Sequence, residues 1–336
     1  MAKRAFYRIM VSGQDISSRF NPLLIDIRIS DREGTHSDTA SIRLDDRDGR
    51  IALPRTGAPI AIMLGWEGAG AASVFVGTVD EVKSSGSRGG GRELTISAKG
   101  VDTEGTSKQP QQKHMDNKTV MEALQEAGRV AGITAIKVDP SFAGHRRDWW
   151  GLNEESFLHF GERLARELGG IFKVRGTEAI LAAKGAGSAT GLTTGSVTGR
   201  YGDNLISWDV SPTMGRPRHR RARARWYDQR EAKWKDVEVD IQDQGARATM
   251  GDRFSRADRT EAQGSANNGA KDAEREKGGG SATIDGDAAA KPGGTFILSG
   301  TRPGIEGVYR IEGVEHAYSR AGWTTKLDLK QPQAGR

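Results

Sequence analysis

Residues 23–34 read LLIDIRISDREG, and this stretch decides the fold class. Its side chains fall into two alternating sets, which are Leu24, Asp26, Arg28 and Ser30 on one face and Leu23, Ile25, Ile27 and Ile29 on the other. Successive side chains of a strand point to opposite faces, so this alternation predicts a strand that buries its apolar face and exposes its polar one. We therefore expect a chain built from half-buried strands.

Further apolar runs surround that strand and are separated by turn residues. They read AFYRIMV (5–11), PIAIMLGW (59–66), VFVGTVDEVKSS (74–85) and RELTISAKGVD (92–102). The last two flank SGSRGGG, whose glycines suit the positive φ angles of a hairpin tip. Several short strands joined by turns at this spacing predict a small antiparallel β-barrel in residues 1–105.

The middle of the chain, residues 106–200, has a mixed pattern. Thr119 and Glu122 predict a capped helix start, because each side chain can accept a hydrogen bond from the other residue's free backbone N–H. Asn153 predicts the N-cap of a second helix, with two glutamates in its first turn, and Gly169–Gly170 predicts its end. The runs IFKVRG and EAILAAKG then predict a hairpin, so we expect an α+β domain here.

Residues 201–336 return to strands and predict a second barrel. The expected strands read NLISWDVSP, TFILSG, GVYRIEGVEHAY and GWTTKLDLK. A polar segment at about 255–280 has alanines spaced along it and predicts a solvated helix or a flexible stretch. The order of Pro-Gly, apolar strand, longer strand, glycine turn and closing strand occurs in both barrels, which favours a duplication. The chain is thus expected to be mainly β with an α+β middle.

The composition limits the class of protein. The chain has 336 residues, 45 glycines, no cysteine, a net charge of +6 and a mean hydropathy of −0.60. The lack of cysteine excludes disulfides and thiolate zinc sites and favours a reducing cytoplasm as the place of synthesis. The N-terminal sequence MAKRAFYRIMVSGQDI has no signal-peptide core, and no apolar run predicts a membrane anchor.

The sequence predicts no catalytic residue, no cofactor site and no metal site. It contains no GxxxxGK loop, no GxSxG elbow and no HExxH motif. The run GAGSATG (185–191) resembles a dinucleotide-binding loop, but its spacing is wrong and a simple loop is expected. The six histidines are scattered without metal-ligand spacing, and no carboxylate pair is singled out for sugar hydrolysis. We therefore expect a protein that is not an enzyme.

The sharpest local feature is HRRARARW (219–226). As a strand, it places Arg221, Arg223 and Arg225 on one face. Their forked guanidinium groups can hold phosphates or an acidic partner surface, and the alternative is a solvated face that discourages edge pairing. No recognition helix accompanies the strand, which disfavours sequence-specific DNA binding.

Four segments in this order resemble the phage late control D family of tail proteins. They are LPRTGAPIAIMLGW with VFVGTVDEV and ISAKGVD, then TVMEALQEAGRVAGI, then NEESFLHFGERLARELGGIFKV, and last KPGGTFILSGTRPGIEGVYRIEGVEHAYSRAGWTTKLDL. This family forms the hub of contractile tails and is similar to the base of type VI secretion spike proteins. The resemblance covers nearly the whole chain and brings no catalytic residue with it.

The resemblance implies two tail-tube-like antiparallel β-barrels plus an inserted α+β domain, in a homotrimer whose six barrels form a ring. Such a ring joins the sixfold tail tube protein to the threefold central spike protein and contacts other baseplate proteins. It encloses a channel through which DNA passes without sequence-specific binding. The residues themselves, and not the resemblance, make Arg221, Arg223 and Arg225 candidates for a partner or lumen contact. The implied location is the virion tail baseplate, assembled in the host cytoplasm.

Two other functions stay open from the sequence. One is a tail-associated cell-wall hydrolase, and the other is the hub of a secretion or bacteriocin-type injection device. A free carbohydrate- or nucleic-acid-binding β-module is a further alternative, but it does not account for the repeated strand order.

Overall fold

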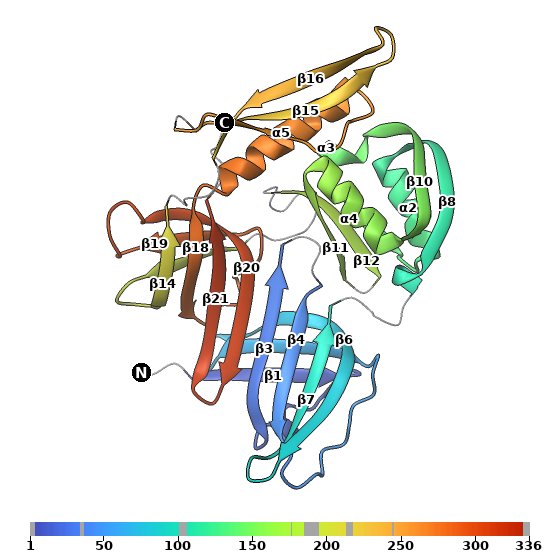
Figure 1. The fold of residues 1–336 in the computed structure, drawn as a ribbon. Coiled ribbons are helices and arrows are strands. Elements are labelled where there is room, and N and C mark those ends of the chain that lie inside the picture. Colours follow the sequence, from blue (N-terminus) through green and yellow to red (C-terminus); the bar gives the residue numbers. More distant parts are fainter. Residues whose placement is uncertain are drawn as a thin grey trace.

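The computed structural model describes residues 4–33, 37–100, 106–175, 177–184, 195–212, 218–243 and 245–331. Figure 1 shows a mainly β molecule in which two curved sheets stand beside each other, with an α+β unit and an arm of strands and one helix above them. The predicted fold class, mainly β with an α+β middle, is confirmed. The run GAGSATG lies outside the described residues.

The first barrel is a curved antiparallel sheet in the order β3-β4-β7-β6-β5-β1. Its elements are β1 (Ala5–Val11), β2 (Gln14–Asp15), α1 (Ser17–Phe20), β3 (Leu24–Arg32), β4 (Thr39–Asp45), β5 (Pro59–Trp66), β6 (Gly70–Ser87) and β7 (Gly91–Lys99). Every second residue of β4, β5 and β7 is buried, as the alternating sequence predicts. All six strands contribute to one apolar core, through residues such as Ile9, Ile27, Ile42, Ile62, Val79 and Leu94.

The second barrel is a curved sheet in the order β14-β18-β21-β20-β19-β13. Its strands are β13 (Ser196–Arg200), β14 (Leu205–Ser211), β18 (Gly279–Asp285), β19 (Thr295–Ser299), β20 (Gly307–Ser319) and β21 (Gly322–Lys330). All neighbours pair antiparallel except β13 and β19, which are parallel. Its core is separate from that of the first barrel and centres on Phe296, Ile311 and Leu327.

Strand β3 of the first barrel pairs antiparallel with β20 of the second, in a register from Asp26↔Ser319 to Arg32↔Gly313. The two barrels therefore share one continuous sheet of 13 strands. Backbone ladders leave little freedom for one barrel to rotate against the other, because each rotation would break several hydrogen bonds at once.

The middle unit packs two helices on small sheets. Its elements are η1 (Thr106–Lys108), β8 (Pro110–Thr119), α2 (Val120–Val130), β9 (Ala135–Val138), α3 (Pro140–Ala143), β10 (Arg146–Ser156), α4 (Phe157–Leu168), β11 (Gly170–Arg175) and β12 (Glu178–Ala183). The predicted hairpin of β11 and β12 is confirmed. Helices α2 and α4 bury Leu124, Phe157, Phe160 and Leu164 in one core.

The sequence predicts the N-cap of α2 correctly and the N-cap of α4 wrongly. Thr119 caps α2, and the reciprocal bonds with Glu122 confirm the predicted capping box. The predicted cap Asn153 of the next helix is wrong, since Ser156 is the N-cap and its hydroxyl accepts from the His159 N–H. Pairing of β10 with β8 continues past Asn153 and keeps that segment extended, so tertiary pairing overrides the local cap signal.

An arm is inserted between β14 and β18. It consists of β15 (His219–Asp228), β16 (Lys233–Asp240) and β17 (Ala248–Gly251), which form their own sheet, and of helix α5 (Arg259–Arg275). The polar segment near 255–280 is therefore a helix. Ala262, Ala266 and Ala270 stand four residues apart and are buried, because their small side chains let α5 approach the sheet closely.

The opening stretch of the sequence holds one wrong prediction. Ile27 and Ile29 are buried as expected, but Leu24, which was placed on the polar face, is also buried. The register of β3 against β4 shifts between Leu24 and Asp26, so Ile25 is an extra residue in a β-bulge. A bulge reverses the alternation on one side of itself, and strict counting by two cannot detect it.

Candidate functional site

The two barrels repeat one topology. In chain order, the strands β1, β3, β4, β5, β6 and β7 of the first correspond to β13, β14, β18, β19, β20 and β21 of the second, and both sheets join them in the same spatial order. Only the outermost contact differs, because β1 lies antiparallel to β5 whereas β13 lies parallel to β19. An arrangement this specific indicates duplication of one barrel.

Two β-bulges recur at matching places. The register of β6 against β7 shifts between Val79 and Glu81, and that of β20 against β21 shifts between Ile311 and Gly313. The second pair of bulges lies after Leu24 in β3 and after Leu205 in β14. Matching bulges align the barrels residue by residue, since each fixes the register of its strand.

This alignment pairs LIDIRIS (24–30) with LISWDVS (205–211). Sequence reasoning found the repeat only in the last three strands of each barrel. It missed this earlier match because the arm separates β14 from β18 in the second barrel, whereas β3 and β4 follow each other closely. The shared Leu-Ile before the bulge was the available signal.

The contact between the barrels is apolar at its centre. Trp323 of β21 is 3% exposed and belongs to the core of the first barrel. Its ring lies 5.6 Å from that of Trp66, whose Nε1–H donates to the Gly286 carbonyl oxygen at 2.8 Å. Tyr318 packs edge-on against Tyr7 at 5.1 Å. The second barrel thus supplies part of the first barrel's core.

A buried histidine lies at the same contact. His316 of β20 is 2% exposed, and its Nδ1 lies 2.9 Å from the Thr325 hydroxyl. Burial lowers the pKa of His316 from 6.5 to about 3, because the imidazolium would lose its hydration there; the charge of Lys291 acts in the same direction and that of Asp31 opposes it. The side chain is therefore neutral at physiological pH and serves packing.

Ion pairs join the first barrel to the middle unit and to the second barrel. Lys173 of β11 bonds Asp31 at 2.5 Å and Asp38 at 3.2 Å, which ties the middle unit to the first barrel. Glu33, just after β3, pairs with Arg310 of β20. Both ends of each pair are largely shielded from water, so these contacts specify how the units meet.

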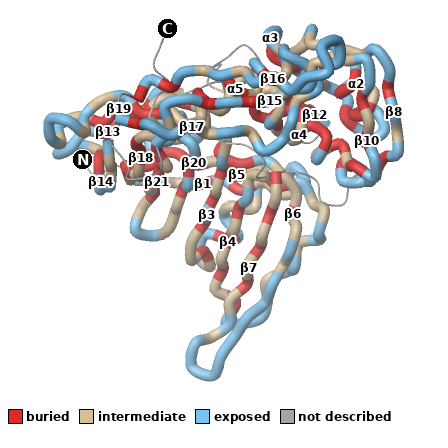
Figure 2. Tube along the Cα trace, turned by 45° about the horizontal axis from the view of Figure 1, so that its top comes forward, coloured by how far each residue is buried: buried red, intermediate tan, exposed pale blue. Residues whose placement is uncertain are grey.

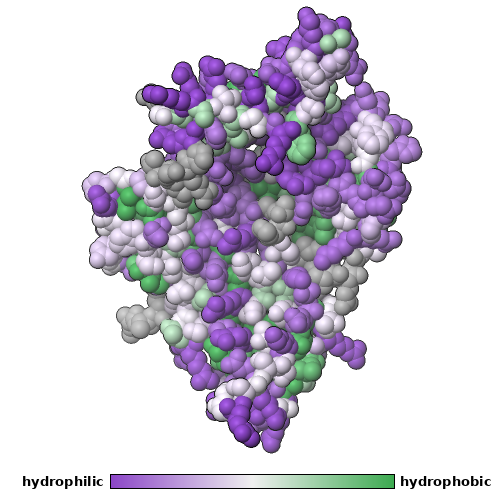
Figure 3. Space-filling model, viewed as in Figure 1, coloured by the Kyte–Doolittle hydropathy of each residue, from purple (hydrophilic) through white to green (hydrophobic). Residues whose placement is uncertain are grey.

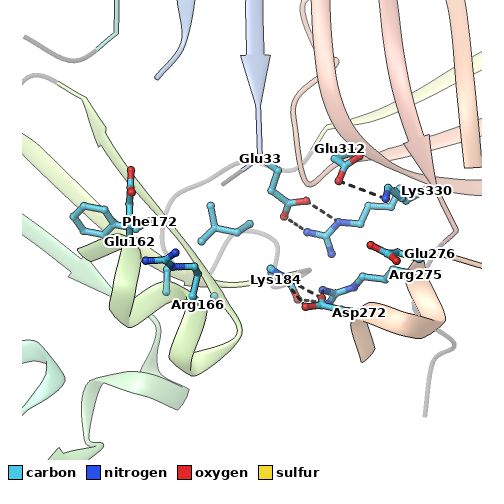
Figure 4. A pocket seen from close by; sticks show the side chains of 14 residues that line it. Glu33, Glu162, Arg166, Phe172, Lys184, Asp272, Arg275, Glu276, Glu312 and Lys330 are labelled. Atoms are coloured by element: carbon cyan, nitrogen blue, oxygen red, sulfur yellow. Dashed lines mark hydrogen bonds and ion pairs between the residues drawn. The ribbon is translucent and has the colours of Figure 1, made fainter. Parts of the chain in front are cut away.

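A charged cavity of about 330 Å³ lies where all units converge. Figure 4 shows Glu33 reaching across from β3, Lys184 bonded to Asp272 of α5, and Glu312 facing Lys330. Burial lowers the pKa of Arg275, which also lines it. Five acidic and five basic side chains line the cavity, so it fits a polar joint between units better than a site for a charged ligand.

A larger apolar groove, of about 860 Å³, opens at the end of the first barrel. Its floor includes Phe20, Ile60 and Ile96, and its wall includes Leu53, which is 64% exposed. Arginines and aspartates from the segment after β4 stand at the rim. A groove of this kind can take apolar side chains of a partner.

The three predicted arginines lie together on the outer face of the arm. Arg221, Arg223 and Arg225 pair in register with Asp240, Glu238 and Asp236 of β16, forming an alternating ladder of charges. The hydrogen bond from Arg221 to Asp240 is 2.9 Å and that from Arg225 to Asp236 is 3.0 Å. These bonds raise the pKa of both guanidinium groups.

The ladder holds three positive and three negative side chains, so its charge is balanced. Ala222 and Ala224 point to the opposite face and are buried against α5, as the alternation predicts. Carboxylates already accept hydrogen bonds from Arg221 and Arg225, and Asp236 lies 3.8 Å from Arg223. The face is therefore better suited to a protein surface of mixed charge than to phosphates.

The tip of the arm carries an exposed aromatic pair. Tyr227 and Trp234 pack edge-on at 5.2 Å, and Trp234 is 57% exposed. Figure 1 shows the β15–β16 hairpin reaching beyond the rest of the molecule. Exposed aromatics on a projecting hairpin are typical of an anchor for a protein partner.

The described part of the chain contains neither a metal cluster nor a membrane-spanning helix. Within the described ranges, no group of three or more histidine, aspartate and glutamate side chains is placed to hold a metal ion. In the same part of the chain, no helix combines the length and apolarity that crossing a bilayer requires.

The sequence is similar to two curated phage proteins. It is 32% identical over 133 residues to the probable baseplate hub protein of Escherichia phage 186, and 30% identical over 169 residues to that of Escherichia phage P2. The matches cover 40% and 50% of this chain, and 33% and 43% of those proteins, so they span less than half of either relative. No family model matches.

Solved structures share the fold over nearly the whole chain. The tail protein of Neisseria meningitidis MC58 matches with a TM-score of 0.67 at 15% identity, covering 98% of this chain and 96% of that one. The 43 kDa tail protein of prophage MuSo2 from Shewanella oneidensis reaches 0.69 at 15% identity, covering 98% and 99%. The E. coli protein c3393, a type VI secretion component, reaches 0.59 at 10% identity, covering 93% and 74%. This chain is similar in sequence to phage baseplate hub proteins and has the fold of phage tail proteins.

Proposed function

We propose that this chain is the structural hub of a contractile phage-type tail baseplate. Three copies form a ring of six barrels that joins a sixfold tail tube to a threefold spike and encloses the delivery channel. The similarity to two named baseplate hub proteins and the tail-protein fold support this role. The chain then works in the virion tail baseplate, after assembly in the host cytoplasm.

The duplication carries the proposal. A ring that meets a sixfold tube on one side and a threefold spike on the other needs two kinds of repeated contact. Two barrels of one topology in each chain give six alike positions from three chains. In this division, residues 1–105 form one barrel, residues 106–200 the α+β domain, and residues 201–336 the other barrel with its arm.

The arm supplies the threefold element. Only the second barrel carries it, because β3 and β4 of the first barrel are joined by a short connection instead. A ring of three chains therefore displays six barrels but three arms. The arginine ladder at Arg221, Arg223 and Arg225 and the aromatic tip are the surfaces for the spike or another baseplate protein, and the apolar groove is available to a further partner.

The charge pattern of the arm does not favour DNA binding. The arginines of the ladder are neutralised by the acidic residues opposite them, so this face has no net positive charge that would hold phosphates. We therefore do not assign sequence-specific DNA binding to this chain. The type VI secretion component with the same fold makes the hub of a secretion or bacteriocin-type device the second candidate.

The test is the symmetry of the purified protein. Light scattering should give the mass of three chains, and images should show six similar lobes with three projections. A strictly monomeric mass at high protein concentration contradicts the proposal. Cell-wall clearing that is lost on replacing a single carboxylate would favour the hydrolase instead, and we expect no clearing.

A further inference from the structure

Each barrel has a strand edge with no neighbour. Among the described residues, no strand pairs with the side of β14 opposite β18 over Ile206–Val210. Likewise, no strand pairs with the side of β6 opposite β7 over Val82–Ser87. Unpaired edges attract other strands, and soluble proteins usually protect them with charges, prolines or covering loops.

The duplication makes these two edges a matched pair. Strand β14 corresponds to β3, and the second half of β6 corresponds to the second half of β20. Strands β3 and β20 are the two that join the barrels within the chain. The free edge of β14 in the second barrel therefore corresponds to the β3 side of that contact. The free edge of β6 in the first barrel corresponds to its β20 side.

Burial differs between the corresponding residues of β3 and β14. Ile27 and Ile29 are 0% and 1% exposed inside the core of the first barrel, which Trp323 of the second barrel also enters. Their counterparts Trp208 and Val210 are only partly buried, and Ile206 beside them is 54% exposed. Figure 3 shows apolar surface on the side of the molecule where β14 lies in Figure 1. Apolar side chains along a free strand edge indicate a covered edge in the assembled state.

The sizes of facing residues also match. Inside the chain, Ile27 of β3 faces Tyr318 of β20. Transferring this register to the free edges places Trp208 opposite Gly86, which corresponds to Tyr318 by the aligned bulges. Each pair sets one aromatic ring against a smaller residue. Gly86 has no side chain and so leaves room for the indole ring of Trp208.

The charges agree with the same register. Transferring the pair Arg28↔Ala317 places Asp209 opposite Ser85. Lys83 then lies diagonally across from Asp209 on the same face, at a spacing where opposite charges attract. Figure 2 shows the β6–β7 hairpin projecting from the first barrel with exposed residues along it, so it is accessible to another chain.

We propose that β14 of one copy pairs antiparallel with residues 82–87 of β6 in the next copy, in the register Asp209↔Ser85 and Trp208↔Gly86. The partner is a second copy of this chain, and the contact repeats the β3–β20 contact head to tail. The sheet then continues from chain to chain around the ring. This inference rests on the proposed function, and it assigns the strands and the register of the contact.

The first experiment uses engineered disulfides, which is direct because the chain has no cysteine. The Glu33 N–H donates to the Glu312 carbonyl, so Arg28↔Ala317, five residues further along, is a pair without mutual hydrogen bonds. Its counterpart is Ser85 with Asp209. The Ser85→Cys/Asp209→Cys chain should form reducible covalent dimers and trimers on oxidation, since opposed residues of this kind have Cα atoms within disulfide range.

The matched control is Ser84→Cys/Asp209→Cys, because a shift of one residue moves the side chain to the other face of the sheet. We expect at least about tenfold less cross-linked product from it. Equal cross-linking of both variants in a chain that still assembles overturns the register while leaving the hub proposal standing. A chain that stays monomeric overturns both.

A second experiment gives Gly86 and Trp208 the residue types that face each other in the β3–β20 contact. Gly86→Tyr should weaken association at least about tenfold, because the new ring meets Trp208 across the contact. A Cβ at Gly86 lies 3.2 Å from the Gly91 carbonyl oxygen, so the substitution needs only a small local shift. Adding Trp208→Ile recreates the Tyr–Ile pair found inside the chain and should restore association. Failure of the double variant to recover contradicts the inference.

Discussion

The two barrels share their strand order and their bulges, yet they differ at corresponding positions. Trp323 stands in β21 of the second barrel where the first barrel has Arg92, and His316 stands where the first has Ser84. The larger apolar or neutral groups lie on the barrel that is covered within the chain. The small and charged groups lie on β6, whose edge is open in a single copy, and on β7 beside it. At corresponding positions of the two barrels, the residue type thus depends more on what each barrel contacts than on the topology that they share.

The arm is the other difference between the barrels. Its sheet and α5 have their own small apolar clusters, built around alanines and separate from both barrel cores. An insertion with its own core can be varied without disturbing the repeat.

The largest effect is expected from Trp323→Ala. Trp323 is 3% exposed and fills the core of the first barrel from the second, so its removal leaves a cavity at their contact. We expect the free energy of unfolding to fall by about 3–5 kcal/mol. Urea denaturation measures the change. The control Trp234→Ala, at the exposed tip of the arm, should leave the midpoint nearly unchanged, and an equal loss in both variants would contradict the separation of arm and barrels.

Acid should destabilise the second barrel through His316. Its pKa is about 3 in the folded chain and 6.5 when exposed, so between these values only the unfolded state binds the proton. Stability therefore falls as the pH is lowered from 6.5 toward 3, with a slope of up to about 1.4 kcal/mol per pH unit.

Denaturant unfolding of the wild type and of His316→Gln at several pH values measures this slope. We expect the variant to be less stable at pH 7 but to lose less stability on acidification. Parallel curves for the two proteins would show that the acid sensitivity arises elsewhere. The first barrel has a serine at the corresponding position and contributes no such titration.

A smaller effect is expected in the arm. Ala266 of α5 is 2% exposed and packs close to Ala224, so Ala266→Leu overfills that contact. We expect a loss of about 1–3 kcal/mol in the local stability of the arm, measured by hydrogen exchange of α5 amides. Gln263→Leu, at an exposed position of the same helix, is the control and should leave exchange unchanged. Faster exchange in the barrel strands would show that the arm is not an independent cluster.

The smallest effect on folding is expected from the arginine ladder. Its ion pairs are exposed, and such pairs add little to stability. Replacing Arg221, Arg223 and Arg225 together by alanine should leave the thermal midpoint of the isolated chain almost unchanged. Binding to a spike or baseplate protein, measured by co-sedimentation, should weaken. Unchanged binding would assign the ladder to solvation alone.

Much of the fold followed from local patterns in the sequence. Alternation predicted the strands, the Thr119 capping box predicted α2, and the Arg–Ala alternation of β15 predicted that its three arginines share one face. The N-cap Asn153 and the burial of Leu24 were predicted wrongly, because strand pairing and a bulge decided them. The candidate contact surfaces were predicted least well, since they combine residues far apart in the chain, such as Trp66 with Trp323.

The sequence by itself determined the class of fold, the mixed middle and the presence of a repeat, because side-chain periodicity and turn residues act over a few positions. Only the tertiary structure decided which strand joins the two barrels, where the bulges align them and which edges stay open. Those features depend on which distant strands pair, and no local pattern in the sequence specifies that choice. Their register is set by the packing of whole sheets against one another.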